Sequence, residues 1–300
     1  MEPPAPAPAP APEDSQAAAT TAPRPGAVTG PLSIAEIYRR SLKPQDLRFN
    51  NWVCRPPAAV LVYLLRSTRV TPNQVTFFSL FVHLGGCAAL LFLRQPAGLW
   101  AAALIGYLAF VLDCVDGQLA RITGKTSTVG SYLDFLVDEL KAFTLIAAVA
   151  GRLAWIGAPL PAPLSILVDS AGGTLSPTVF WLAIGLCGVV VAASGISITT
   201  FTRRPEYFEA VHGVKGERVP GFTRFKEPVK DAPPPSLIGS LVRLPVRVLE
   251  GLGKTALHYP AWFYIPALLD RIEWFLVPYL LAHALYLARA GLVVLIKLGR

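Results

Sequence analysis

Four aspartates within 26 residues are the part of the sequence best suited to chemistry. They stand in two pairs, Asp113 with Asp116 and Asp134 with Asp138, at the end of one apolar stretch and the start of the next. On helices, spacings of three and four residues place the members of each pair on one face. A charge at the centre of a membrane helix costs about 2.5–3.5 kcal/mol on insertion scales, and acids at membrane depth usually mark a functional site. The spacing therefore predicts an inward-facing acidic site at the ends of two membrane helices.

The four carboxylates need positive charge among them. A short turn over 122–129 should make the two helices antiparallel neighbours, so that all four side chains converge. Clustered oxygen ligands without His or Cys suit Mg²⁺ or Mn²⁺. Two ions fit four carboxylates, and paired ions ~3.5–4 Å apart recur in enzymes of in-line phosphoryl displacement. The predicted cofactor is a pair of Mg²⁺ ions, with Mn²⁺ as an alternative.

Small and basic residues beside the acids favour a phosphate ligand. Gly117 lets a ligand approach the helix backbone closely. Arg121, one turn further on, can hold a phosphate by paired hydrogen bonds. Gly130 allows close packing where the second of the two helices begins. Together these positions predict metal-assisted chemistry on a phosphate group.

The elements that position these residues belong to a membrane protein. Of the 300 residues, 53% are hydrophobic and 15% are charged, against about 25% charged in soluble domains, which excludes a soluble globular protein. The net charge of +8 suits either nucleic acid or an anionic membrane. The mean hydropathy of +0.49 favours the membrane, and no nucleic-acid partner is expected. The four cysteines form no CxxC pair and are interpreted as small buried hydrophobes.

The apolar runs predict an all-α integral membrane protein with six transmembrane helices. About 20 residues are needed to cross the ~30 Å hydrocarbon layer. The fifth run is the weakest, because it is short and contains two prolines. The predicted spans are Val75–Leu93, Ala97–Leu112, Leu133–Ala150, Pro177–Phe201, Thr255–Leu269 and Trp274–Ile296.

Three further segments complete the predicted organisation. Residues 1–31 are rich in Pro and Ala and are expected to be a disordered tail. Residues 32–70 are interpreted as an amphipathic juxtamembrane segment whose apolar part, Ala58–Leu65, forms a helix on an anionic leaflet; a solvated connector is the alternative. Residues 71–300 form the membrane domain, within which 203–254 is a basic cytoplasmic insertion. The excess of Lys and Arg in 203–254 and in the turn Arg121–Lys125 predicts that both termini and the acidic site lie on the cytoplasmic side of the inner membrane.

The acidic stretch resembles the CDP-alcohol phosphatidyltransferase family. Every fixed position of the pattern D-x-x-D-G-x-x-A-R-x₈-G-x-x-x-D-x-x-x-D is present from Asp113 to Asp138, and Thr71–Thr76 looks like the family's entry to its first span. The resemblance covers about residues 50–204. At Glu139 the sequence departs from many relatives, which carry Arg at that position. Lys141 follows two residues later.

The resemblance implies a role for each matching residue. Asp113, Asp116, Asp134 and Asp138 would bind the two metal ions, and Asp138 would also be the general base. The residues implied to contact the CDP donor are Asn73, Gln74, Val75, Thr76, Gly117, Arg121 and Ser127. Arg203 and Arg204 would either bind a phosphate of the acceptor or anchor the cytoplasmic end of their span. A homodimer is implied as well.

The implied activity is transfer of a phosphatidyl group from a CDP-alcohol, most simply CDP-diacylglycerol, to a small hydroxyl acceptor, with release of CMP. Three alternatives stay open on the sequence. The first is a CDP-choline or CDP-ethanolamine type of donor with diacylglycerol as acceptor. The second is a Mg²⁺-dependent intramembrane prenyltransferase, although such enzymes place their acidic motifs far apart in the chain. The third is a cation transporter or inactive scaffold.

Overall fold

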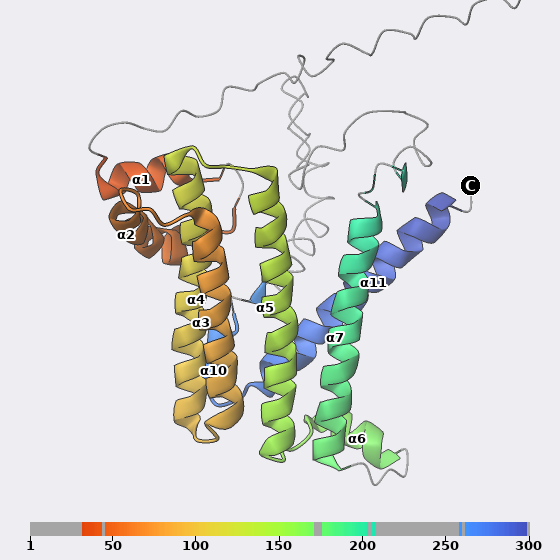
Figure 1. Ribbon diagram of the computed structural model, residues 1–300. Coiled ribbons are helices and arrows are strands. Elements are labelled where there is room, and N and C mark those ends of the chain that lie inside the picture. Colours follow the sequence, from red (N-terminus) through yellow and green to blue (C-terminus); the bar gives the residue numbers. More distant parts are fainter. Residues whose placement is uncertain are drawn as a thin grey trace, which may run out of the picture.

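The computed structural model describes residues 32–43, 46–170, 176–202, 204, 206–207, 258–259 and 262–298, and these residues contain helices and no strand. Figure 1 shows long helices lying side by side, with α11 (Glu273–Leu298) running obliquely to them. A π-helical turn over Asn50–Cys54 precedes the second helix. The helices are α1 (Ile34–Ser41), α2 (Arg55–Leu65), α3 (Pro72–Phe92), α4 (Pro96–Thr123), α5 (Thr128–Trp155), α6 (Ala162–Ser170), α7 (Pro177–Thr202), α10 (Tyr264–Leu268) and α11 (Glu273–Leu298).

The helices confirm the predicted all-α membrane class. Four of them, α3, α4, α7 and α11, are long and apolar enough to cross a membrane, and each contains one of the predicted spans. Helix α5 contains the predicted span Leu133–Ala150 and has 28 residues, about 42 Å at 1.5 Å per residue. Helix α5 is not among the helices that are apolar enough by composition, because it contains charged residues. Those charged residues are the ones of interest for function.

The count of six spans is not confirmed. In the fifth predicted span, Thr255–Leu269, the helix that the structure describes is α10, which has five residues. At 1.5 Å per residue such a helix covers about 7.5 Å, far less than the ~30 Å hydrocarbon layer. Residues 255–257, 260 and 261 of this span lie outside the described part of the chain.

Helix α3 organises the bundle. It packs against both α4 and α5; α5 packs in turn against α7, and α7 against α11. Helices α4 and α5 run antiparallel, as predicted, with the chain reversing between them at Gly124–Ser127 (Figure 1), and side chains rather than closely packed backbones bring them together. The space between the two helices holds the carboxylates that face one another, and α3 fills the rest.

One basic residue of α5, Arg152, binds the turn between α3 and α4. Arg152 is buried, and its guanidinium donates hydrogen bonds to the carbonyl oxygens of Leu90, Leu93 and Arg94 at 2.9, 2.6 and 3.0 Å. The last carbonyls of a helix have no partner within it, so a cation there stabilises the helix end. Gly98 completes this turn, since a Cβ there would lie 1.9 Å from the Leu93 oxygen.

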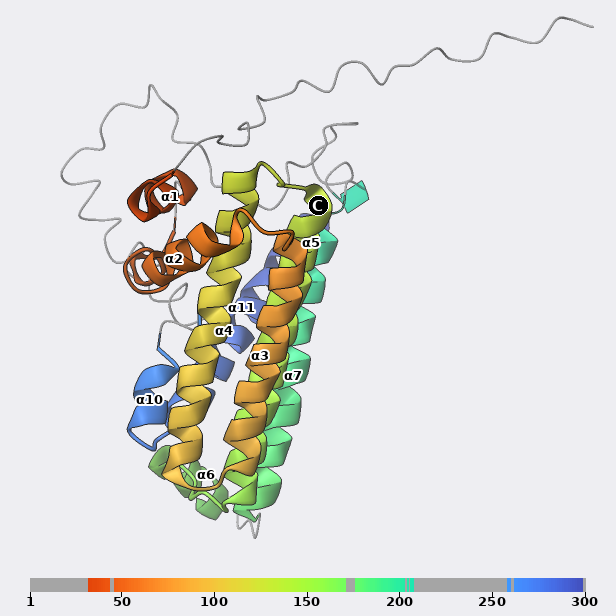
Figure 2. The same ribbon diagram turned by 60° about the vertical axis from the view of Figure 1, so that its left-hand side comes forward.

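Helices α1 and α2 lie crosswise to the long helices, beside the end of α4 that leads into α5 (Figure 2). Ser33 and Glu36 form a capping box at the start of α1. The apolar face of α2, with Ala58, Ala59 and Val62, packs into a cluster with α4 residues. A crosswise helix at the end of the bundle fits the predicted interfacial segment, although α2 begins earlier than expected, at Arg55. The predicted tail 1–31 and, apart from three residues, the insertion 203–254 lie outside the described residues.

Candidate active site

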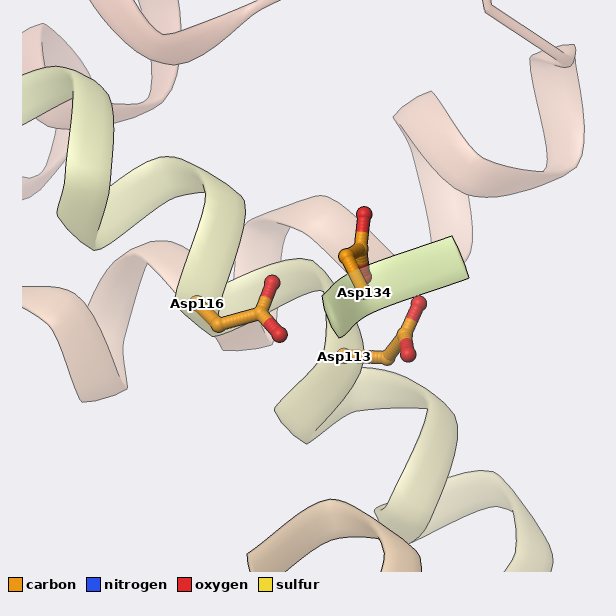
Figure 3. A group of neighbouring side chains, drawn as sticks. All are labelled: Asp113, Asp116 and Asp134. Atoms are coloured by element: carbon orange, nitrogen blue, oxygen red, sulfur yellow. The ribbon is translucent and has the colours of Figure 1, made fainter. Parts of the chain in front are cut away.

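Three of the four aspartates form one group. Asp113 and Asp116 come from α4 and Asp134 from α5, and one carboxylate oxygen of each lies within 4.8 Å of the other two. Figure 3 shows the three side chains reaching toward a common space between the helices. We call these residues the aspartate trio. Carboxylate oxygens at such separations repel one another unless a cation lies among them, and an oxygen-only set favours a hard divalent ion.

Helix α3 holds one member of the trio in place. The hydroxyl of Thr76 donates a hydrogen bond to Asp116 Oδ2 at 2.5 Å. Both side chains are buried, with 3% and 4% of their surface exposed. Thr76 lies in the first turns of α3, whose start is fixed by a capping box between Thr71 and Gln74. The predicted entry motif therefore contributes the threonine that orients Asp116.

The fourth aspartate, Asp138, is not a member of the trio but shares a cationic partner with it. Asp138 Oδ1 is 3.7 Å from Nζ of Lys141, one turn further along α5. The same Nζ forms an ion pair with Asp113 Oδ1. The Lys141 side chain is 2% exposed, whereas that of Asp138 is 51% exposed. Within the described residues, Lys141 is thus the cation in contact with the acidic site.

A first cavity, of about 740 Å³, opens beside the trio. Asp116 and Asp134 line it together with Lys43, Arg121 and Lys125, and we call it the basic cavity. The guanidinium of Arg121 lies against Gly117, where a Cβ would meet Nη1 at 3.3 Å. A glycine at this position leaves the arginine free to lie along the helix surface. The cavity therefore offers cations and an open stretch of backbone close to the carboxylates.

The segment containing α1 fixes Arg121 from outside the bundle. Arg121 Nε donates to the carbonyl oxygen of Ser41 at 2.9 Å, and Arg55 Nη1 reaches the same oxygen at 3.4 Å. Arg55 is paired with Asp46, with 2.5 Å between Nη2 and Oδ2. Burial would raise the pKa of Asp46, but the Arg55 guanidinium and the Asn50 amide hold the pKa below its usual 3.8. The Asp46–Arg55 pair thus anchors the chain that contacts Arg121.

A second cavity, of about 1010 Å³, lies along the next turns of α5. Asp138 and Glu139 line it with aromatic side chains from the later part of the chain, among them Tyr279 and Tyr286, and we call it the aromatic cavity. Tyr286 Oη lies 2.6 Å from the hydroxyl of Thr199. No lysine or arginine is among the described residues that line it. The two cavities therefore present opposite charge to a ligand.

Most of the predicted donor-binding residues line the basic cavity, and two of them do not. Asn73, Thr76, Gly117, Arg121 and Ser127 all line the basic cavity. The side chain of Gln74 accepts from the Thr71 backbone at 2.9 Å, and Val75 is buried in the cluster with α2 and α4. These two residues shape the start of α3 and are not among those that line the cavity.

The predicted acceptor residues lie at the edge of the described chain. Arg204 is exposed just after α7, and Arg203 lies outside the described residues. Sequence reasoning missed Lys43 and Lys125 in the basic cavity and the role of Lys141. A lysine within an apolar helix, three residues after an aspartate, was the available signal, because charges at membrane depth usually pair with one another.

Comparisons with known proteins agree with this geometry. Residues 69–204 match the family described as CDP-alcohol phosphatidyltransferase. The chain is 32% identical over 120 residues to a phosphatidylinositol phosphate synthase of Corynebacterium glutamicum, covering 39% of this chain and 52% of the relative. It is 36% identical over 93 residues to an archaetidylinositol phosphate synthase of Pyrococcus horikoshii, covering 30% and 47%.

The name of a third relative contains a different acceptor substrate. It is a CDP-diacylglycerol–glycerol-3-phosphate 3-phosphatidyltransferase of Cereibacter sphaeroides, 30% identical over 92 residues, covering 30% of this chain and 42% of the relative. The chain thus spans about half the length of the curated relatives it matches. The matched region contains the trio, Thr76, Arg121 and Asp138. Residues 69–204 therefore form a CDP-alcohol phosphatidyltransferase domain.

Proposed function

We propose that this protein transfers a phosphatidyl group from CDP-diacylglycerol to a small hydroxyl compound and releases CMP. The observation that carries the proposal is the position of the aspartate trio, which adjoins a cavity containing three cations on one side and Asp138 on the other. This arrangement suits a diphosphate donor and a separate acceptor that meet at the carboxylates. We also propose that the bundle lies in the inner membrane as a homodimer, with this end facing the cytoplasm.

The basic cavity suits the donor. Lys43, Arg121 and Lys125 can neutralise the diphosphate of a CDP-alcohol, and the Arg121 fork can bind one phosphate by two parallel hydrogen bonds. Ser127 and Asn73 offer hydrogen-bonding groups to the nucleotide. The bond from Arg121 to the Ser41 carbonyl restrains the guanidinium before a ligand arrives. Preorganised donors of this kind stabilise charge that develops on a leaving phosphate.

The trio fits a divalent cation because it offers three carboxylates of suitable separation and hardness. When bound there, Mg²⁺ or Mn²⁺ would supply Lewis-acid stabilisation of the diphosphate oxygens. The chain's part is to hold the ligands: Thr76 orients Asp116, and Lys141 orients Asp113.

Asp138 is the proposed general base. Its half-exposed carboxylate faces the aromatic cavity, where it can accept the proton of an acceptor hydroxyl. The acceptor oxygen then forms a bond to the phosphorus of the phosphatidyl group. The bond from that phosphorus to the oxygen of the cytidylate breaks, and the electron pair leaves with CMP. Asp134 and Asp138 lie one turn apart on α5, and Asp113 and Asp116 belong to α4.

The acceptor is proposed to enter through the aromatic cavity. Two relatives are named as inositol phosphate synthases and a third for glycerol 3-phosphate, so phosphorylated acceptors are the first to test. Arg204, exposed at the end of α7 near the last lining residue of that helix, Thr199, is placed to meet such a phosphate. The Glu139 carboxylate in the same lining favours an unphosphorylated alcohol instead.

The test is CMP release by the purified full chain in detergent with Mg²⁺. CDP-diacylglycerol is offered with inositol phosphate, glycerol phosphate, serine, inositol and choline, each alone. We expect CMP with at least one acceptor and none with the Asp113→Asn, Asp138→Asn double variant. CMP release by that double variant would contradict the proposal. Activity only with CDP-choline and diacylglycerol would reverse the direction of transfer, and binding of a prenyl diphosphate without CDP would favour a prenyltransferase.

A further inference from the structure

The acidic site contains a positive charge of its own. Lys141 is almost completely buried, and its ammonium contacts Asp113 and lies 3.7 Å from Asp138. Of these two aspartates, Asp113 belongs to the trio and Asp138 does not. A buried lysine at membrane depth is stable only with an anionic partner, and here it has two, on different helices.

The position of Lys141 conflicts with the expectation of two metal ions. A second ion that uses Asp138 as a ligand must also use a neighbouring carboxylate, and Asp113 is the one that shares a partner with Asp138. The ammonium already lies at ion-pair distance from both of these carboxylates. A divalent cation a few ångström from it would meet strong repulsion, because charges interact more strongly away from water.

Lys141 has little room to move aside. Only 2% of its side chain is exposed, and its helix neighbours Val137 and Ala142 are buried as well. His83 of α3 lies beside the backbone of Lys141 and is also buried, 3.3 Å from the sulfur of Cys87. A lysine at the surface could swing into water when an ion arrives, whereas this one would have to leave its pocket.

We propose that Lys141 replaces the second metal ion, so that the site binds one divalent cation at Asp113, Asp116 and Asp134. The ammonium holds Asp113 in the trio and keeps Asp138 close to it without making Asp138 a metal ligand. Lys141 is then a positioning residue for the general base. The inference deepens the proposed function and rests on it for the role of Asp138, while the ion count is independent of catalysis.

The experiment is a Mn²⁺ titration of the purified full chain, followed by calorimetry and by electron paramagnetic resonance. We expect one Mn²⁺ per chain with the spectrum of an isolated ion. Two Mn²⁺ per chain with a spin-coupled spectrum would overturn the inference and leave the proposed function intact. Absence of any Mn²⁺ binding, together with absence of CMP release, would instead count against both.

Two variants of Lys141 provide matched tests. Lys141→Met keeps the length of the side chain and removes the charge. The number of Mn²⁺ ions bound per chain should therefore rise to two, and the spectrum should become spin-coupled. Lys141→Arg keeps the charge and should keep the count at one. A count of one in Lys141→Met, in protein that elutes and melts like the parent, would show that the lysine does not exclude the second ion. If Lys141→Met does not fold, a count of two in Lys141→Arg or in the parent still overturns the inference.

Discussion

The basic cavity and the aromatic cavity adjoin successive turns of the same helix and yet suit different ligands. The first cavity contains Lys43, Arg121 and Lys125, whereas the second combines Glu139 with tyrosines from the later part of the chain. The change takes place at the aspartates. A reaction between a strongly anionic donor and a second substrate needs this kind of division, because each substrate must be bound without entering the other's place.

The difference also shows which parts of the fold build each cavity. The basic cavity is built from the segment before α2, the start of α3 and the turn between α4 and α5, all near one end of the bundle. The aromatic cavity uses α7 and α11, which lie further along the chain. The family match ends at residue 204, after α7. The donor side is therefore contained in the family domain and the segment before it, while the acceptor side includes residues beyond the domain.

Asp113 connects the trio with Lys141, so its loss should have the largest effect. Its carboxylate is part of the trio and is the ion-pair partner of Lys141. In Asp113→Asn we expect CMP release to fall by about 10³-fold or more, the scale on which loss of electrostatic stabilisation acts. Mn²⁺ affinity, measured by titration, should fall in parallel. Glu206→Gln, an exposed carboxylate outside both cavities, is the control. A fall of less than tenfold in Asp113→Asn would separate the trio from catalysis.

Arg121 tests the basic cavity alone. Arg121→Lys keeps the charge but loses the planar fork and the Nε bond to Ser41. We expect a loss of about 2 kcal/mol, or roughly 30-fold in kcat/KM for the donor, since hydrogen bonds to charged groups contribute about 1.5–3 kcal/mol. The KM for the acceptor should change little. Steady-state kinetics with each substrate varied in turn provide the measurement. An effect confined to the acceptor would reverse the assignment of the cavities.

Glu139 tests the aromatic cavity alone. Glu139→Gln removes the charge. It should raise kcat/KM for a phosphorylated acceptor relative to its unphosphorylated form, because the side chain then no longer repels the phosphate. About 1 kcal/mol is expected for charges several ångström apart near the protein surface, or a fivefold change in the ratio of kcat/KM values. Inositol phosphate and inositol are the pair to compare, and Glu139→Asp keeps the charge as the control. An unchanged ratio would place the acceptor's phosphate away from Glu139.

The sequence predicted the trio because its signal is local. Spacings of three and four residues on two helices, joined by a short turn, almost determine where Asp113, Asp116 and Asp134 point. The sequence did not show how far apart the α4 and α5 backbones lie, since hydropathy says which faces are buried but not which helix covers them. Here α3 lies against both. The resemblance also implied that Asp138 binds a metal ion; its carboxylate lies 3.7 Å from Lys141, three residues further along the same helix.

The part of the basic cavity contributed from outside the bundle was the least predictable. Lys43 reaches the cavity because the segment before α2 folds back over α4, and this path depends on contacts between distant residues. Arg121 and Arg55 share the Ser41 carbonyl across 80 and 14 residues of sequence. Such tertiary bonds leave no periodic pattern. A buried arginine close in sequence to an aspartate, as with Arg55 and Asp46, was the available signal.

We expect the smallest effect from substitution of Asp46, which tests whether the segment before α2 supports the basic cavity. Asp46→Asn removes the charge that holds Arg55 and should lower the stability of the folded chain by about 1–3 kcal/mol at neutral pH. Because the pKa of Asp46 is lowered on folding, the contribution is fully present above pH 3.8 and is lost as the pH falls through the folded value. Melting of parent and variant in detergent should therefore converge below pH 3.8. Donor KM should rise modestly in the variant, through Arg121, with acceptor KM unchanged. Equal melting curves at pH 7 would show that the pair does not anchor the segment.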